Sequence, residues 1–201
     1  PGIEKKHRSL FYYCIFMMVI EFTGYLEMVF GRSNNHTLFT FANIGFYLFY
    51  FYFVLQSMVN VGYKNIIRSL RIIYLAFSIT NILFIQRLNE LNTFSNIVGC
   101  IFVSIGCCLY YAEFIAENQV VSFIQRPDFF LITGIFFFCS LMGINFTIHR
   151  YYAYTNMDLI HKVRPVHQAI KIIANYSMYS LMSVYCILIW NKRKSLAYSS
   201  R

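Results

Sequence analysis

Six apolar segments, each about long enough to cross a lipid bilayer, occupy most of this 201-residue chain. A helix rises about 1.5 Å per residue, so about 20 mostly apolar residues span the hydrocarbon core. The sequence therefore predicts an all-α, polytopic transmembrane helical bundle that forms a single domain over residues 1–201. The segments cover approximately residues 9–30, 37–60, 70–85, 93–116, 129–149 and 169–190.

The composition argues against a soluble helical protein. Apolar residues make up 58% of the chain and charged residues 12%, whereas an average soluble domain is about 25% charged. Soluble helices need a polar face, but these segments are apolar all round. A cleaved signal peptide does not explain the first segment, because five comparable segments follow it.

Basic residues give the chain a net charge of +9. In a soluble protein this charge would suggest nucleic acid, but here Lys and Arg lie between the spans, where they set topology and meet anionic headgroups. We therefore expect no nucleic acid partner. With both termini cytoplasmic, 11 of the 17 Lys and Arg residues lie on the cytoplasmic side and 6 on the other. We expect a multi-pass integral membrane protein, located in the cytoplasmic (inner) membrane if the source is bacterial.

Two helix boundaries and two connectors can be assigned from local signals. Pro127 and Asp128 predict the start of the fifth helix, because Pro suits the first turn and Asp the positive end of the helix dipole. Gly31 predicts the end of the first helix. Residues 61–69 are expected to form a connector, and residues 150–168 the one connector long enough to hold structure of its own.

The sequence carries no recognisable catalytic or metal-binding motif. Its six cysteines all fall inside spans, where they are expected to pack rather than to form disulfides or ligate metal. Ser-His-Asp, HExxH, P-loop and dinucleotide-binding patterns are absent from the sequence. We therefore expect a non-enzymatic protein without a cofactor or metal.

Glu21 is the most anomalous residue, because it lies near the middle of the first span. A charged carboxylate at that depth costs about 2.5–3.5 kcal/mol on insertion scales. It is either a group that carries a proton, coordinates a cation or balances the charge of a ligand, or a protonated or hydrogen-bonded packing residue that faces the bundle interior.

Other acids lie nearer the span ends. Glu27 and Lys171 fall at similar depths on the first and last spans, so a Glu27–Lys171 pair would neutralise both. Glu113 and Glu117 are four residues apart on one helix face, where like charges repel. Water, Arg126 or a cation could relieve that repulsion.

Five asparagines lie inside spans, and we expect them to form interhelical hydrogen bonds worth about 0.6–2 kcal/mol each. A polar cavity lined by these side chains is the alternative. The asparagines are Asn43, Asn81, Asn96, Asn145 and Asn175.

The chain resembles a group of small, uncharacterised polytopic membrane proteins of Bacteroidota. The resemblance rests on residues 21–25 (EFTGY), Asn34-Asn35, residues 126–134 (RPDFFLITG), Asn175 and Tyr179. It implies a seven-span sensory or accessory module, which would place one more span before Pro1. It carries over no functional residue.

Two functions therefore remain open from the sequence. The first is a sensory or accessory subunit of a membrane assembly, with the lipid bilayer and other membrane or cytoplasmic protein subunits as partners. The second is a transporter or channel subunit that uses Glu21 as its proton or cation group, although paired repeats and broken helices are not evident. A lipid-directed membrane enzyme ranks third.

Overall fold

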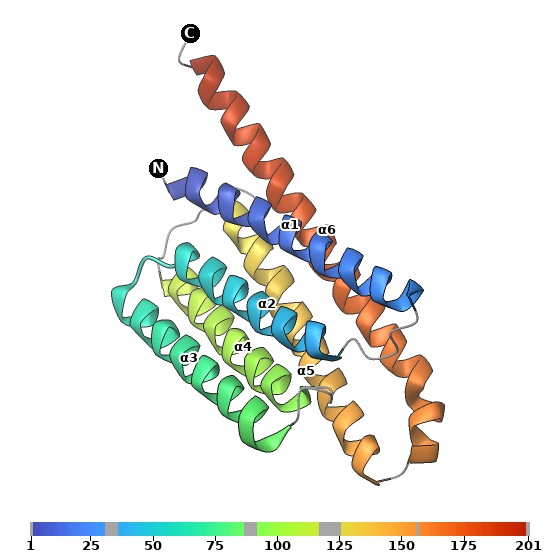
Figure 1. Ribbon diagram of the computed structural model, residues 1–201. Coiled ribbons are helices and arrows are strands. Elements are labelled where there is room, and N and C mark those ends of the chain that lie inside the picture. The colour runs from blue at the N-terminus through green and yellow to red at the C-terminus, as the bar shows by residue number, and fades with distance from the viewer. Residues whose placement is uncertain (1, 31–35, 87–91, 117–125, 156, 200–201) are drawn as a thin grey trace. The chain divides into compact units, whose positions relative to one another are not determined.

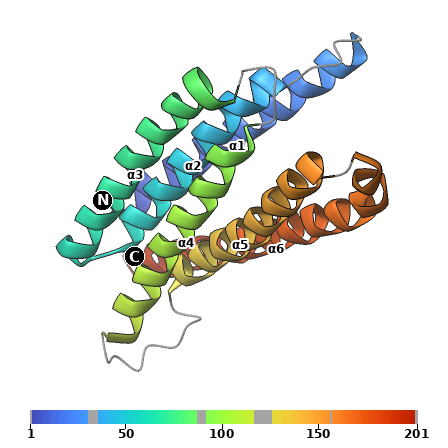
Figure 2. The same cartoon turned by 90° about the horizontal axis from the view of Figure 1, so that it is seen from below.

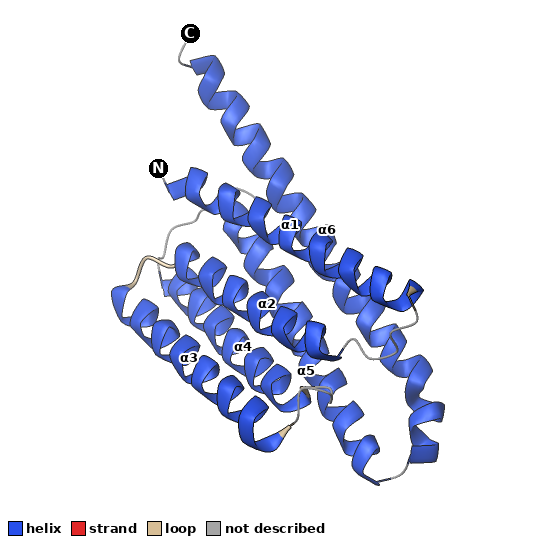
Figure 3. Cartoon of the chain, viewed as in Figure 1, coloured by secondary structure: helices blue, strands red, loops and turns tan. Residues whose placement is uncertain are grey.

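Nearly every residue is helical in the part of the chain that the computed structural model describes, residues 2–30, 36–86, 92–116, 126–155 and 157–199. No described residue lies in a strand, as Figure 3 shows. The helices are α1 (Gly2–Val29), α2 (His36–Ser57), α3 (Val61–Thr80), the π-helical turn η1 (Asn81–Ile85), α4 (Thr93–Ala116), α5 (Pro127–Thr155) and α6 (Met157–Ser199) (Figure 1).

Six stretches of the described helices are long and apolar enough to cross a membrane, which confirms the predicted fold class. They are Arg8–Glu27, His36–Ser57, Val61–Ile85, Thr93–Ala116, Pro127–Tyr152 and Val163–Lys192. The protein is thus a multi-pass integral membrane protein. The chain divides into two compact units, Pro1–Phe102 and Val103–Arg201, and α4 contributes its first part to unit 1 and its second part to unit 2.

The third helix begins earlier than predicted. Residues 61–69, expected to be a connector, form the first turns of α3, and α2 ends at Ser57 rather than at residue 60. The Asn60 side chain caps α3, because its Oδ1 accepts a hydrogen bond from the Tyr63 backbone N–H at 3.1 Å. A good N-cap and strong helix formers such as Lys64 and Arg68 therefore extend the helix through a charged stretch.

Residues 150–168, predicted to be a connector long enough to hold structure of its own, are mostly helical, and the connection between the membrane spans is shorter than predicted, because the spans end at Tyr152 and begin at Val163. Helix α5 continues to Thr155, and α6 begins at Met157 and contains Pro165 within its length. The predicted helix start is confirmed, because Pro127 opens α5 with Asp128 in its first turn. Gly31, the predicted stop of the first helix, lies outside the described residues.

In unit 1, an aromatic layer joins α1 to α2. The Tyr13 ring makes edge-to-face contacts with Phe49 and Phe53, with centroids 5.6 and 5.9 Å apart. The Tyr13 and Tyr50 hydroxyl oxygens are 3.1 Å apart, within hydrogen-bonding distance. Aromatic pairs of this geometry contribute about 0.5–1.5 kcal/mol beyond their buried area, so the layer fixes which face of α1 meets α2.

In unit 2, α5 and α6 form an antiparallel pair that lies side by side in both views (Figures 1 and 2). Gly134 allows the close approach, because a Cβ atom there would lie 3.2 Å from Leu181 Cβ and 3.4 Å from the Met178 carbonyl oxygen. Small residues serve this purpose between membrane helices. Tyr111 on α4 reaches α5, where its hydroxyl donates to Thr133 Oγ1 at 3.0 Å.

Candidate functional site

A buried group of four polar side chains joins the end of α3 to the start of α4 in unit 1. These residues, Asn81, Gln86, Asn92 and Ser95, form what we call the amide cluster, and each is at most 4% exposed. Buried polar groups cost free energy unless they are hydrogen-bonded. The cluster is therefore either a structural link or a place where a polar ligand binds.

The π-helical turn η1 brings Gln86 into this cluster. The Gln86 backbone N–H donates to the carbonyl oxygen of Asn81 at 2.8 Å, five residues back along the chain. Gln86 Oε1 in turn accepts the backbone N–H of Phe94 at 3.1 Å, in the first turn of α4. Gln86 therefore ends one helix through its backbone N–H and begins the next through its side chain, and π-turns of this kind are frequent at functional sites.

Three oxygen atoms converge on the amide nitrogen of Asn81. Gln86 Oε1 lies 3.1 Å from Asn81 Nδ2, Ser95 Oγ lies 3.0 Å away, and Asn92 Oδ1 lies 2.5 Å away. A side-chain amide has only two N–H bonds to donate. Asn81 Oδ1 is buried and has no hydrogen-bond partner among the described residues.

Tyr47 on α2 contacts α4 at Asn96, the residue after Ser95 of the amide cluster. Its hydroxyl donates to the Asn96 carbonyl oxygen at 3.0 Å and lies 3.1 Å from Cys100 Sγ. The Tyr47 ring packs so closely on Gly99 that a Cβ atom there would lie 2.8 Å from the ring. Gly99 is therefore needed for α2 and α4 to approach each other.

A second polar group, which we call the histidine cluster, lies between α5 and α6 in unit 2. It consists of Asn145, His149 and His167. Asn145 Oδ1 lies 2.6 Å from His167 Nδ1, and both residues are buried. The rings of His149 and His167 meet edge to face with centroids 5.6 Å apart. These two contacts link α5 to the part of α6 where the membrane span begins.

Replacing Asn145 with alanine should lower the free energy of unfolding by about 1 kcal/mol, because His167 loses its buried partner. Denaturation of the purified protein in detergent would measure the loss. Asn175→Ala is the matched control, since Asn175 lies in the same unit but is only half-buried. Equal costs for the two changes would contradict the structural role of the Asn145–His167 contact.

Some of the asparagines and acids that the sequence singled out are buried and hydrogen-bonded, and others are half-buried or exposed. The predicted interhelical hydrogen bonds are confirmed for Asn81, which bonds to Ser95 on α4, and for Asn145, while Asn175 is half-buried and Glu21 is exposed. Glu27 is half-buried, and its Oε2 has no hydrogen-bond partner among the described residues. Lys171 is exposed. Since Glu27 and Lys171 belong to different units, their pairing stays a prediction.

The predicted acidic pair is only partly described. Glu113 is half-buried on α4, and Glu117 lies outside the described residues. The guanidinium carbon of Arg126 lies 5.2 Å from the centroid of the Phe114 ring, next to Glu113 in sequence. The repulsion between the two carboxylates, and its relief, therefore stay predictions.

Sequence reasoning missed Gln86, Asn92, Ser95 and His167. Gln86, Asn92 and His167 lie in segments that the sequence predicts to be connectors, where polar residues are ordinary. The one available signal was the Asn92-Thr93 pair before an apolar run, which is typical of a helix N-terminus. Such a cap pattern does not reveal that Asn92 faces Asn81.

The two clusters offer different chemical groups. The amide cluster offers neutral oxygens, and the histidine cluster offers ring nitrogens. Within the described residues, no group of three or more His, Cys, Asp or Glu side chains is placed to hold a metal ion. Comparisons of the chain with protein-family models, curated proteins and solved structures found no match.

Proposed function

We propose that this protein is a non-enzymatic sensory or accessory subunit of a membrane assembly, and that one face of α1 docks a transmembrane helix of a partner protein. The observation that carries the proposal is the position of Glu21, an exposed acid inside the membrane span Arg8–Glu27 that lies one helical turn from the exposed apolar residues Met18 and Tyr25.

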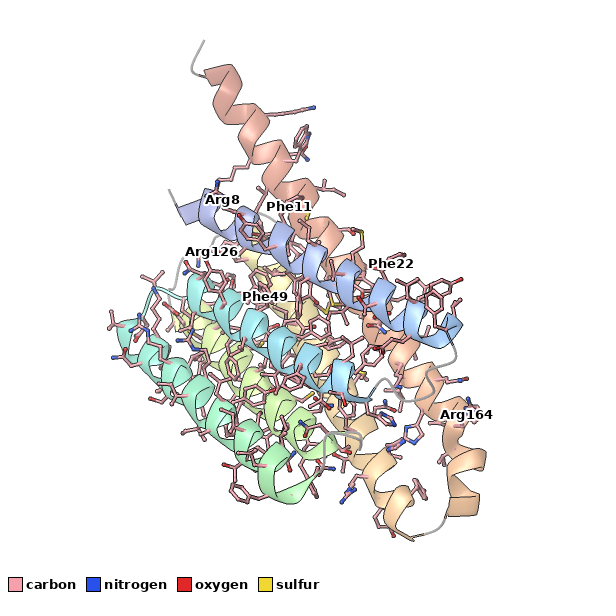
Figure 4. The ribbon with its side chains drawn as sticks, viewed as in Figure 1. Arg8, Phe11, Phe22, Phe49, Arg126 and Arg164 are labelled. Carbon is pink, nitrogen blue, oxygen red and sulfur yellow. The ribbon has the colours of Figure 1, made fainter. Side chains whose placement is uncertain are left out.

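The docking face, which we call the partner face, is defined by exposed apolar residues at helical spacing along α1. The opposite side of the helix carries the buried residues Leu10, Tyr13 and Ile20. Glu21 belongs to the exposed side, because it lies three residues after Met18 and four before Tyr25. The partner face consists of Phe11, Ile15, Met18, Phe22, Tyr25 and Val29, of which Figure 4 labels Phe11 and Phe22.

The charge of Glu21 indicates the chemistry of the partner. Glu21 forms no hydrogen bond or ion pair with a described residue, and a carboxylate at this depth costs about 2.5–3.5 kcal/mol. Intramembrane charges are usually paired with one another. A partner helix that is apolar and carries Lys or Arg near its middle would neutralise Glu21 while covering the apolar side chains around it.

Helix α6 supports a role in passing a signal across the membrane. Its 43 residues would extend about 65 Å at 1.5 Å per residue, about twice the thickness of the hydrocarbon core. Lys194 Nζ lies 5.5 Å from the centroid of the exposed Trp190 ring, and such residues anchor helices at the interface. The histidine cluster lies toward the other end, so α6 links the two membrane surfaces.

The proposal is tested by the size of the native complex after Glu21→Gln. We expect the change to reduce the fraction of the protein found in a larger complex about tenfold, since loss of about 1.4 kcal/mol of pairing energy lowers an association constant by that factor. The measurement is native electrophoresis of membranes solubilised in mild detergent, with cross-linking and mass spectrometry to identify the partner.

Met18→Gln is the matched control, because it puts the same polar amide on the partner face without removing a charge. It should leave most of the complex intact. A complex of unchanged size and abundance in Glu21→Gln would contradict the proposal. Ion flux through liposomes containing only this chain, abolished by Glu21→Gln, would instead favour the transporter or channel function.

A further inference from the structure

We propose that three basic residues on one side of α3, Lys64, Arg68 and Arg71, bind the phosphate of an anionic phospholipid. We call this set of residues the basic face. Successive residues of an α-helix turn by about 100°, so residues at this spacing fall within an arc of about 60° around the helix. The basic face is separate from the partner face of α1 and does not depend on the function proposed for that face.

Two of these residues lie within the thickness of the hydrocarbon core. Helix α3 and the turn η1 form one apolar stretch of 25 residues, Val61–Ile85, and about 20 residues cross the core. Any choice of about 20 consecutive residues from this stretch includes Arg68 and Arg71. A charge at this depth costs free energy, so both guanidinium groups need either an anion or a route to the headgroups.

The side chain of Arg68 extends toward the end of α3 at which the span begins. Its Nη1 donates a hydrogen bond to Asn65 Oδ1 at 2.8 Å, three residues closer to the helix N-terminus. Helical side chains tilt in this direction, and long basic side chains use it to reach the headgroups. A guanidinium has five N–H groups, so this bond leaves others for a phosphate, which Arg binds through two parallel hydrogen bonds.

The helix that packs against α3 in unit 1 offers these cations no counter-charge. Tyr47 on α2 contacts Tyr74 on α3 with ring centroids 5.4 Å apart, but residues 28–89, which include both helices, contain no Asp or Glu. Lys64 and Arg71 are half-buried, and neither side chain forms an ion pair or hydrogen bond with a described residue. The counter-charge must therefore come from outside α2 and α3, and anionic headgroups supply it at a membrane surface.

The test compares two lipids for binding to the purified full chain in a nonionic detergent. Native mass spectrometry during titration with phosphatidylglycerol or phosphatidylcholine gives the two dissociation constants. One basic residue near an anionic headgroup contributes about fivefold in affinity. We therefore expect phosphatidylglycerol to bind more than about tenfold more tightly than phosphatidylcholine, and Arg68→Gln and Arg71→Gln each to weaken its binding about fivefold.

Arg8→Gln is the matched control, because Arg8 is exposed on α1 and its replacement removes the same charge from a position outside the basic face. It should leave the affinity for phosphatidylglycerol nearly unchanged. An equal loss in Arg8→Gln would overturn the proposal, and so would equal affinities for the two lipids, a comparison that needs no variant. Displacement of phosphatidylglycerol by an excess of inorganic phosphate would show that the basic face takes a free phosphate and would overturn its assignment to a lipid.

Discussion

Replacing Asn81 with leucine is expected to lower the free energy of unfolding by about 2 to 3 kcal/mol, the largest effect of any change proposed for this protein. Leucine is close to asparagine in size but donates no hydrogen bond. Asn92 Oδ1 and Ser95 Oγ would lose the N–H groups now directed at them, while Gln86 Oε1 keeps the Phe94 N–H. Each buried acceptor left without a donor costs about 1–3 kcal/mol.

The measurement is chemical denaturation of the purified protein in detergent. Asn65→Leu serves as the control, because Asn65 is exposed on α3 and its Oδ1 accepts one hydrogen bond from Arg68. It should cost less than about 0.5 kcal/mol. If Asn81→Leu were as mild as Asn65→Leu, the amide cluster would not hold α3 to α4.

Replacing Gly99 with alanine is expected to lower the free energy of unfolding by about 2 kcal/mol. The added methyl group would lie 2.8 Å from the buried Tyr47 ring, so the ring must move and strain its hydrogen bond to the Asn96 carbonyl. Overpacking costs about 1–3 kcal/mol, to which the strained hydrogen bond adds. The better helix propensity of alanine offsets about 1 kcal/mol of this cost.

A double-mutant cycle with Tyr47→Leu separates these contributions. In a protein that lacks the Tyr47 ring, Gly99→Ala should be neutral or slightly stabilising, because only the gain in helix propensity remains. The coupling between the two positions should therefore exceed about 1.5 kcal/mol, which is typical of residues in direct contact. Additive effects would show that Gly99 is not needed for the packing of Tyr47.

Much of the helical fold was predictable because the bilayer imposes length and polarity on each span. The fourth helix has the predicted bounds, and Pro127 opens α5 as expected. The charged residues Lys64 and Arg68 favoured a connector, yet the cap at Asn60 and the helix propensity of these residues extend α3 over them. Where lipid does not constrain the backbone, such local signals decide the boundaries.

The candidate sites were predictable only in part, for a similar reason. Asn81 and Asn145 could be singled out because an amide inside a span requires a partner. The partners Gln86 and His167 could not, since both lie in predicted connectors; the structure places Gln86 just after η1 and His167 inside α6. Glu21 was expected either to act chemically or to face the interior, and its exposure was not foreseen.

The π-helical turn makes the end of one helix and the start of the next a single cooperative unit. Residues five apart in an α-helix point about 140° away from each other, so η1 would swing Gln86 away from Asn81 if it relaxed to α-helical geometry. The Phe94 N–H would then lose the oxygen that now accepts it. The rate at which the Phe94 amide hydrogen exchanges with solvent therefore reports whether the π-helical turn Asn81–Ile85 is intact.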